Sequence, residues 1–288
     1  MRLAITGTTG RVGRALADHL ADGHEVLELP REACDLASPD LLSRLRELEF
    51  DALLNPAAIT SLELCEDEPE LAQRVNAEAP GELASMCREA GRRLLHFSTD
   101  YVLAGDRPGL HGEDAPLGPC SVYGRTKLEG ERRVLDRGGC VMRVSWVFGP
   151  ERPAFPDQII KQALAGEPME AVGDKKSLPG YTRDLVGWVR AVMEAGFPNQ
   201  AIHSCNGGDP VSWHGMAEEI VDFMFERGDL KTRPIIGRNS LTEIAGFRAE
   251  RPRHTAMATE ILTGLLGKPP RDWREALREH VAERLIIR

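Results

Sequence analysis

A tyrosine and a lysine four residues apart are the pair in this sequence best suited to proton transfer. Tyr123 and Lys127 begin and end the run Tyr-Gly-Arg-Thr-Lys, and on a helix this spacing places both side chains on one face. A nearby ammonium favours the tyrosinate, so we expect the pKa of Tyr123 to fall from about 10 toward the working pH. The same spacing also occurs on ordinary solvated helices, so the rest of the chain must decide what the pair does.

Hydroxyl residues precede this pair and directly follow an apolar run. Ser98 and Thr99 come after residues 92–97, which have the composition of a buried strand. Ligands of an open parallel sheet bind beyond the carboxyl ends of its strands, so we expect Thr99 and Asp100 to face a site. A polar transition from strand to loop is the alternative interpretation.

The N-terminal segment has the pattern of a dinucleotide site. An apolar strand over 3–6 leads into Gly7-Thr-Thr-Gly10-Arg-Val-Gly13, and residues 14–20 have helical apolar spacing. Glycines in such a turn permit a tight bend and a close approach to pyrophosphate, and the helix N-terminus attracts phosphate. A glycine-rich turn without a ligand is the alternative.

The end of the second expected strand, 24–29, bears on the choice of cofactor. An acid at this position would bind the 2′-hydroxyl of NAD, whereas an arginine accommodates the 2′-phosphate of NADP. The chain has Leu29-Pro-Arg31 and no acid there, which favours NADP(H) and leaves NAD(H) as the alternative. Glu32 beside it weakens the preference, and Arg31 could equally be an exposed loop arginine.

Strand and helix patterns alternate along the first half of the chain and loosen after residue 150. Further strands are expected at 50–55, from 140 and at 200–204. A helix is expected at 38–48, with Ser38 as its N-cap, and another at 70–91, where Pro80 should kink or divide the helix. Further helices are expected at 119–135, 155–165, 182–195, 212–227 and 271–285. We therefore expect an α/β fold, with a doubly wound parallel sheet (Rossmann-like) in residues 1–150. Residues 151–288 should form a smaller interleaved substrate-binding lobe, with some segments returning to the core.

Composition and charge exclude several classes of protein. The 288 residues carry a formal net charge of −9, which argues against a nucleic acid partner but allows an anionic ligand at a locally positive site. We find no bilayer-length apolar run and no secretory signal, so we expect a cytoplasmic protein with no membrane partner. The six cysteines form no C-x-x-C and no zinc-spaced cluster with histidines, so no metal site is expected. A homodimer is compatible with these features.

Taken in order, these motifs resemble the extended short-chain dehydrogenase/reductase family, for which G-x-x-G-x-x-G is typical. Within that family the similarity is to the dTDP-4-dehydrorhamnose reductases, and it is carried by the segments 55–60, 76–80, 97–102, 123–129, 143–148 and 250–253. It spans nearly the whole chain and is most specific between Gly7 and Phe148. The resemblance implies an NAD(P)H-dependent oxidoreductase that reduces a nucleotide-linked 4-keto sugar, dTDP-4-dehydrorhamnose, to dTDP-rhamnose.

The resemblance also implies roles for individual residues. The cofactor would lie against Gly7, Thr9, Gly10, Arg11, Val12, Gly13, Arg31, Asp35, Leu36, Ala57, Ala58 and Thr60. Tyr123 and Lys127 would hold its ribose and act in the chemistry, with Thr99 completing the triad. Tyr123 would donate a proton to the ketone oxygen while Thr99 hydrogen-bonds that oxygen. Asp100, Trp146 and Arg251 are expected on the substrate side, although Trp146 could as easily be a core aromatic.

The chain departs from the family pattern on the substrate side. These reductases usually carry Asp-Gln-x-Gly-x-Pro-Thr, whereas residues 174–180 read Asp-Lys-Lys-Ser-Leu-Pro-Gly. The later Arg-Pro segment is followed by His254-Thr255-Ala-Met in place of the usual serine and leucine. Reduction by a nicotinamide cofactor is therefore better supported than the dTDP-sugar itself.

Two other functions stay open. One is an epimerase or dehydratase of the same fold acting on a nucleotide sugar, although no Asp-Glu pair follows Thr99 as dehydratases generally require. The other is a non-catalytic regulatory subunit like that of methionine adenosyltransferase, which resembles the same reductases. Retention of Thr99, Tyr123 and Lys127 argues against the second.

Overall fold

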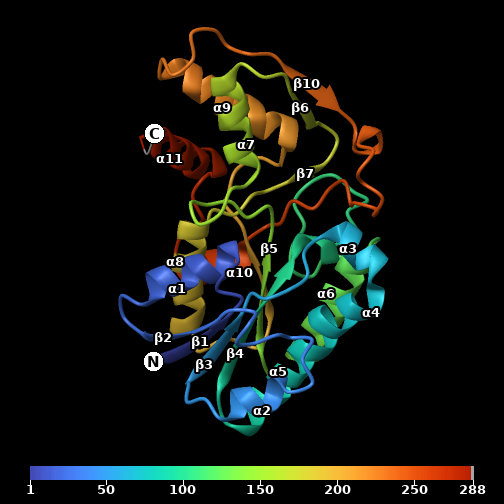
Figure 1. The fold of residues 1–288 in the computed structure, drawn as a ribbon, viewed down its shortest axis with the longest axis vertical. Coiled ribbons are helices and arrows are strands. Elements are labelled where there is room, and N and C mark those ends of the chain that lie inside the picture. The colour runs from blue at the N-terminus through green and yellow to red at the C-terminus, as the bar shows by residue number, and fades with distance from the viewer. Residues whose placement is uncertain (287–288) are drawn as a thin grey trace.

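Alternating apolar side chains build a sheet that is buried on both faces. In β1 (Arg2–Thr6), Leu3 and Ile5 pack in one core cluster and Ala4 packs in another on the opposite face. The computed structural model, which describes residues 1–286, joins six parallel strands in the order β2-β1-β3-β4-β5-β8 (Figure 1). The other five are β2 (Glu25–Leu29), β3 (Ala52–Asn55), β4 (Arg93–Thr99), β5 (Cys140–Val144) and β8 (Ala201–Ser204). The expected doubly wound parallel sheet is confirmed.

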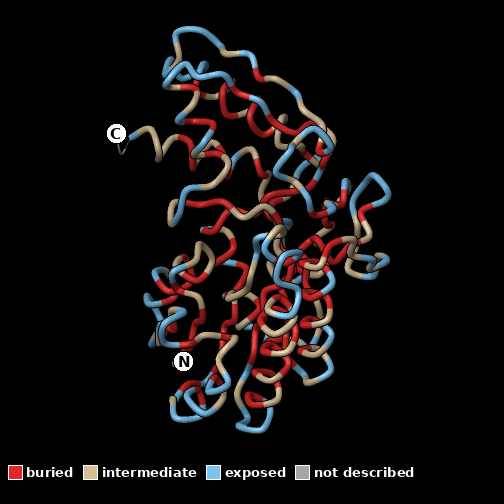
Figure 2. The backbone as a smooth tube through the Cα atoms, turned by 45° about the vertical axis from the view of Figure 1, so that its right-hand side comes forward, coloured by how far each residue is buried: buried red, intermediate tan, exposed pale blue. Residues whose placement is uncertain are grey.

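Helices cover both faces of this sheet. One face carries α1 (Arg11–Leu20), α8 (Thr182–Glu194) and α10 (Glu260–Leu266), and the other carries α2 (Leu41–Arg46), α5 (Ala79–Glu89) and α6 (Val122–Leu135) (Figure 1). Strands β1, β3, β4, β5 and β8 are largely buried, whereas the edge strand β2 is partly exposed. The loops at the end of the core that faces away from the C-terminal lobe are mostly exposed (Figure 2). The order of strands reverses between β1 and β3, and such a reversal leaves a crevice for a ligand.

Two local expectations about helices have different outcomes. The long helix expected over 70–91 is divided, as predicted, into α4 (Pro69–Gln73), a π-helical turn (Arg74–Glu78) and α5, in which Pro80 occupies the first turn. The expected N-cap at Ser38 is wrong, because its hydroxyl accepts from the Asp40 N–H in a preceding turn and the helix begins at Leu41. A short helix, α3 (Leu62–Asp67), precedes α4.

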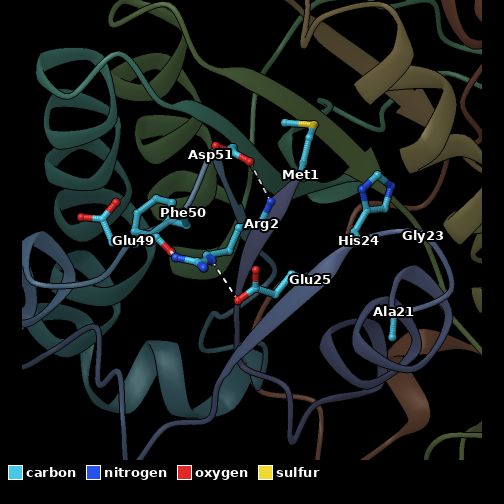
Figure 3. Close-up of a pocket in the computed structure, with 9 residues that line it drawn as sticks. All are labelled: Met1, Arg2, Ala21, Gly23, His24, Glu25, Glu49, Phe50 and Asp51. Carbon is cyan, nitrogen blue, oxygen red and sulfur yellow. Dashed lines mark hydrogen bonds and ion pairs between the residues drawn. The ribbon is translucent and has the colours of Figure 1, made fainter.

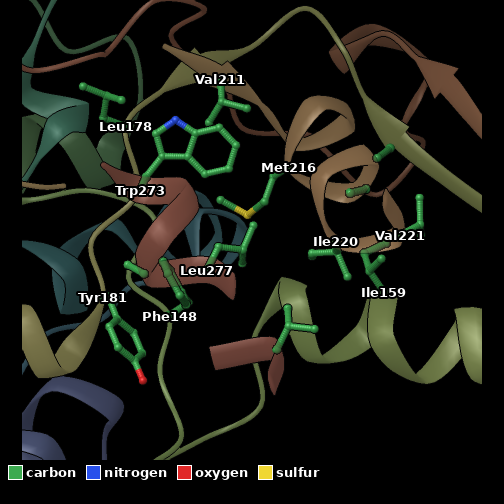
Figure 4. Packing of buried hydrophobic residues seen from close by; sticks show 14 of the residues in the cluster. Phe148, Ile159, Leu178, Tyr181, Val211, Met216, Ile220, Val221, Trp273 and Leu277 are labelled. Carbon is green, nitrogen blue, oxygen red and sulfur yellow. The ribbon is translucent and has the colours of Figure 1, made fainter. Parts of the chain in front are cut away.

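The C-terminal half adds a smaller lobe beyond the carboxyl ends of the strands (Figure 1). Its elements are α7 (Phe155–Ala165), β6 (Met169–Val172), β7 (Lys176–Ser177), β9 (Val211–Ser212), α9 (Trp213–Glu226), β10 (Ile236–Asn239) and α11 (Trp273–Ile286). Aromatic and aliphatic side chains such as Phe148, Tyr181 and Trp273 form its core (Figure 4). The lobe is interleaved with the sheet, because β8 pairs with β5 in parallel. The division at residue 150 stays a prediction.

Candidate active site

A cleft of about 840 Å³ lies at the carboxyl ends of β1, β3, β4 and β5. All the residues expected to bind the cofactor line it, namely Gly7, Thr9, Gly10, Arg11, Val12, Gly13, Arg31, Asp35, Leu36, Ala57, Ala58 and Thr60. The expected catalytic residues Thr99, Tyr123 and Lys127 line it as well, with Asp100 and Trp146. The structure therefore brings together, in one cleft, residues spread over the first half of the chain.

The glycine turn at one end of the cleft fits a pyrophosphate. Gly7 has a φ of +58°, which favours glycine, and a Cβ on Gly13 would lie 2.2 Å from the carbonyl oxygen of Gly7. The following helix, α1, begins at Arg11, its N-cap Gly10 has no side chain to cap it, and its first turn contains no acid. Its first N–H groups and its dipole are thus available to an anion.

Two arginines connect this turn to the loop that leaves β5. The Arg11 guanidinium donates to the carbonyl oxygens of Val147 at 3.0 Å and Pro153 at 2.8 Å. Arg152 donates in return to the carbonyl oxygen of Thr9 at 3.1 Å and lines the cleft. Arg11 thus has its side chain engaged with protein, which leaves its backbone N–H for a phosphate. Arg152 was missed, since no pattern distinguishes it from other loop arginines.

Arg31 lines the cleft two residues after the end of β2, where the sequence predicts contact with the adenosine part of a cofactor. Its side chain is 74% exposed, and Nε is 3.6 Å from Asp35 Oδ2. A loose, exposed ion pair of this kind is worth little, so the guanidinium can meet a phosphate at small cost. The geometry fits an NADP-binding arginine, while the Asp35 carboxylate opposes a second negative charge.

Helix α6 delivers Tyr123 and Lys127 side by side into the cleft. The Ser121 hydroxyl accepts from the Gly124 N–H at 3.2 Å and fixes the start of the helix. Lys127 is 2% exposed, and its Nζ donates to the carbonyl oxygen of Phe97 at 2.6 Å and lies 3.2 Å from His96 Nε2. Burial lowers the pKa of Lys127 to about 7.

The expected lowering of the Tyr123 pKa by Lys127 is wrong. Burial raises the pKa of Tyr123 above its ordinary value, the Thr99 hydroxyl acts in the opposite direction, and the charge of Asp100 raises it further. The ammonium of Lys127 is directed at β4 rather than at the phenol. Tyr123 is consequently held protonated at neutral pH, which is the form that a proton donor requires.

Thr99 and Asp100 stand where β4 ends. Thr99 Oγ1 accepts from the Tyr101 N–H at 3.2 Å and lies 3.2 Å from Asp100 Oδ1, to which it donates. A hydroxyl has one proton, so Thr99 donates either to Asp100 or to a substrate oxygen, but not to both.

Trp146 and Arg251, the two other residues expected on the substrate side, lie in different places. Trp146 lines the cleft with a φ of +40°, and its ring centroid is 5.5 Å from that of Trp213, so it belongs to both the site and the lobe core. Arg251 does not line the cleft. Its guanidinium donates to Glu63 Oε1 at 2.8 Å and stacks 3.6 Å from the Phe247 ring centroid.

A second depression lies at the amino ends of the strands (Figure 3). Here the Arg2 guanidinium pairs with the Glu25 carboxylate at 2.9 Å, and the backbone N–H of Arg2 donates to Asp51 Oδ2 at 2.7 Å. Ligands of such sheets bind at the opposite ends of the strands, so this depression is not the candidate site. Among residues 1–286, no cluster of three His, Cys, Asp or Glu side chains could hold a metal ion, and none of the helices within this range could cross a membrane.

The parallel sheet, the glycine turn and the Tyr–Lys pair define a class, the dinucleotide-dependent oxidoreductases of Rossmann-type fold. The chain belongs to the family described as RmlD substrate binding domain, whose model matches residues 1–286. The expected membership of the dTDP-4-dehydrorhamnose reductase type, and with it the prediction of an oxidoreductase, is confirmed.

Named relatives cover nearly the whole chain. The dTDP-4-dehydrorhamnose reductase of Mycolicibacterium smegmatis is 36% identical over 98% of this chain and 85% of that protein. A probable dTDP-4,6-dihydroxy-2-methyloxan-3-one 4-ketoreductase of Streptomyces antibioticus is 34% identical over 97% of this chain and 94% of that protein. The crystal structure of the Bacillus anthracis dTDP-4-dehydrorhamnose reductase with NADP superposes with a TM-score of 0.88 at 25% identity, covering 98% of this chain and 99% of that one.

Proposed function

We propose that this protein reduces the 4-keto group of a dTDP-linked sugar, with dTDP-4-dehydrorhamnose as substrate and NADP(H) as cofactor. The observation that carries the proposal is the meeting of Thr99, Tyr123 and Lys127 in the cleft that begins at the uncapped glycine turn. Relatives named for reduction of two different dTDP-linked keto sugars support the reaction more strongly than the particular sugar.

The proposed chemistry assigns a task to each residue. The bound cofactor supplies the hydride. Tyr123, whose pKa is raised by burial, donates its proton to the ketone oxygen as negative charge develops there. Thr99 hydrogen-bonds that oxygen and also acts on Tyr123, whose pKa its hydroxyl lowers, while Lys127, held by the Phe97 carbonyl oxygen, would hold the ribose of the cofactor. Together the residues lower the barrier to charge development in a nearly dry site.

NADP(H) is favoured over NAD(H) because Arg31 is exposed where the adenosine part of the cofactor is expected. The Bacillus anthracis dTDP-4-dehydrorhamnose reductase, 25% identical to this chain, is a complex with NADP, which supports the same choice. Asp35 is the residue that would favour NAD(H) instead, since a carboxylate can bind the ribose hydroxyl.

The test is oxidation of NADPH and NADH by the purified protein against a panel of nucleotide-linked 4-keto sugars. The wild-type chain should consume NADPH with dTDP-4-dehydrorhamnose, and Tyr123→Phe should lower kcat about 100-fold or more. Unaffected turnover in that variant would remove Tyr123 from the chemistry.

Two results would favour the other functions. Turnover without added NADPH by protein that carries bound NAD would indicate an epimerase or dehydratase. Cofactor binding without reduction of any keto sugar, together with stable co-purification with a larger enzyme, would indicate a regulatory subunit.

A further inference from the structure

Behind the cleft, three buried hydroxyl groups converge on the carboxylate of Asp100. Its Oδ1 accepts from Thr99 Oγ1 at 3.2 Å, on the cleft side. Its Oδ2 accepts from Ser177 Oγ at 3.1 Å and from Thr255 Oγ1 at 2.5 Å, on the lobe side. The side chains of all four residues are buried, with Thr99 and Asp100 at the edge of the cleft.

Lys175 supplies a positive charge on the lobe side of this group. Its side chain is fully buried, and Nζ donates to Thr255 Oγ1 at 3.3 Å and to the carbonyl oxygen of Pro252 at 2.9 Å. The ammonium also lies 4.6 Å from the centroid of the Tyr101 ring, which lines the cleft. Burial lowers the pKa of Lys175 to about 8 against the opposing effect of Asp100, so the group is charged at neutral pH.

The direction of each hydrogen bond links this cation to Thr99. An ammonium only donates, so Thr255 accepts from Lys175 and gives its own proton to Asp100. A buried carboxylate without a compensating charge needs every donor within reach. Thr255 donates to Oδ2, and Ser177 can donate to it as well, although its one proton can also go to the Thr255 carbonyl oxygen at 3.3 Å. With the charge of Lys175 held close by through Thr255, Oδ1 can give up the proton of Thr99 to a substrate oxygen.

We propose that Lys175 is a positioning residue that acts through Thr255 and Asp100 to leave the Thr99 hydroxyl free to donate to the substrate oxygen. Lys175 is fully buried and is not among the residues that line the cleft, so we assign it no direct contact with the substrate. The inference rests on the proposed function, because Thr99 has a substrate oxygen to donate to only in that reaction.

Removal of the charge is the first test, with Lys175→Met and Lys175→Gln compared with Lys176→Met. Lys176 follows Lys175 in the chain, is the first residue of β7 and is exposed, so it serves as a matched control. Both Lys175 variants should lose about tenfold or more in kcat, because a donor to the developing charge is weakened. KM for the keto sugar and Kd for NADPH should stay within about twofold, because neither ligand touches Lys175. The control should match the wild type.

The Gln variant separates charge from hydrogen bonding and carries the test if the Met variant does not fold. Its amide can still donate to Thr255 and Pro252 but has no charge. Wild-type kcat in Lys175→Gln would overturn the proposal, as would a loss confined to KM.

The second test adds Asp100→Asn to Lys175→Met. Asp100→Asn alone should be impaired, since Asp100 lines the cleft. In the double variant the neutral amide at position 100 attracts the Thr99 proton less strongly than an uncompensated carboxylate does, so kcat should recover relative to Lys175→Met. Losses that multiply would overturn the inference, because the two residues would then act independently.

Urea unfolding of the wild type, the Lys175→Met and Asp100→Asn variants and the double variant needs no substrate. It therefore distinguishes failure of this inference from failure of the proposed function. If the charge of Lys175 compensates that of Asp100, Lys175→Met should lower the urea midpoint less in the Asp100→Asn variant than in the wild type. Identical shifts in the two backgrounds, with an active wild-type enzyme, would overturn this inference alone. A wild-type chain that reduces no keto sugar would overturn the proposed function and leave the midpoint comparison to decide the charge coupling.

Discussion

The ammonium of Lys127 should make the stability of the protein rise with pH, in a way that Lys127→Met abolishes. The side chain is 2% exposed, and burial lowers its pKa from 10.5 to about 7. Each tenfold change in proton affinity is worth about 1.4 kcal/mol, so the buried charge costs up to about 5 kcal/mol of folding free energy. Below pH 7 both the folded and the unfolded chain carry the proton, and the cost applies in full.

Between about pH 7 and pH 10.5 the unfolded chain binds a proton that the folded chain does not. The free energy of unfolding therefore rises with pH across this range. From pH 6 to pH 9 the wild type should gain about 3 kcal/mol relative to Lys127→Met, which has no group to titrate. The absolute difference at pH 6 is less diagnostic, because methionine also leaves the Phe97 carbonyl without its donor, at about 1–3 kcal/mol.

The assay is urea unfolding of both proteins at a series of pH values from 6 to 9. The difference between them isolates Lys127, because every other titrating group is common to both. Lys161→Met, on the exposed side of α7, is the matched control, and its difference from the wild type should stay constant. A constant difference for Lys127→Met as well would refute the lowered pKa and the buried position from which it follows.

Three further predictions concern single contacts. Arg31→Ala should weaken NADP(H) binding about tenfold by calorimetry with little effect on NAD(H), since one phosphate contact is lost; equal losses would contradict the assignment of Arg31. Gly13→Ala places a Cβ 2.2 Å from the Gly7 carbonyl oxygen, so urea unfolding should show a loss of about 1–3 kcal/mol, and wild-type stability would contradict that contact. In the wild type the buried carboxylate of Glu131 lies 3.1 Å from Arg143 Nε. Arg143→Met removes this partner and should lower the free energy of unfolding by about 3–5 kcal/mol. Adding Glu131→Gln should recover part of that loss, and additive losses would show that the pair is not coupled.

The cleft was predictable because each of its parts follows directly from an apolar run. In a parallel sheet the carboxyl ends of neighbouring strands meet at one edge, so Gly7 after β1, Ala57 after β3 and Thr99 at the end of β4 converge. The local sequence was therefore enough to predict most of the fold and the residues at the strand ends that line the cleft.

The pKa of Tyr123 was not predictable from spacing alone. The separation of Tyr123 and Lys127 describes which face they share, but it carries no information about burial or about other partners. Burial changes the proton affinity of the phenol more than a neighbouring ammonium that is already engaged by the Phe97 carbonyl.

Local sequence patterns also could not predict the contacts between distant segments of the chain. Strands β6 and β10 have four residues each and pair only because the lobe brings them together, so neither has a length or an alternation that marks it. Arg251 was placed on the substrate side by motif, yet its partner Glu63 is 188 residues away in the chain. Only the tertiary fold decides which acid such an arginine meets.

The residues that we propose for catalysis also depend on contacts between distant parts of the sequence. Thr99, Tyr123 and Lys127 all come from the first half of the chain, and the cleft they line includes the whole glycine turn. Asp100, however, obtains two of its three hydroxyl donors from residues 77 and 155 positions farther along, both in the lobe. Docking of the lobe thus determines which groups are available to Asp100, and through Asp100 whether the proton of Thr99 can turn toward a substrate. The lobe should therefore contribute to the rate of the chemical step as well as to recognition of the sugar.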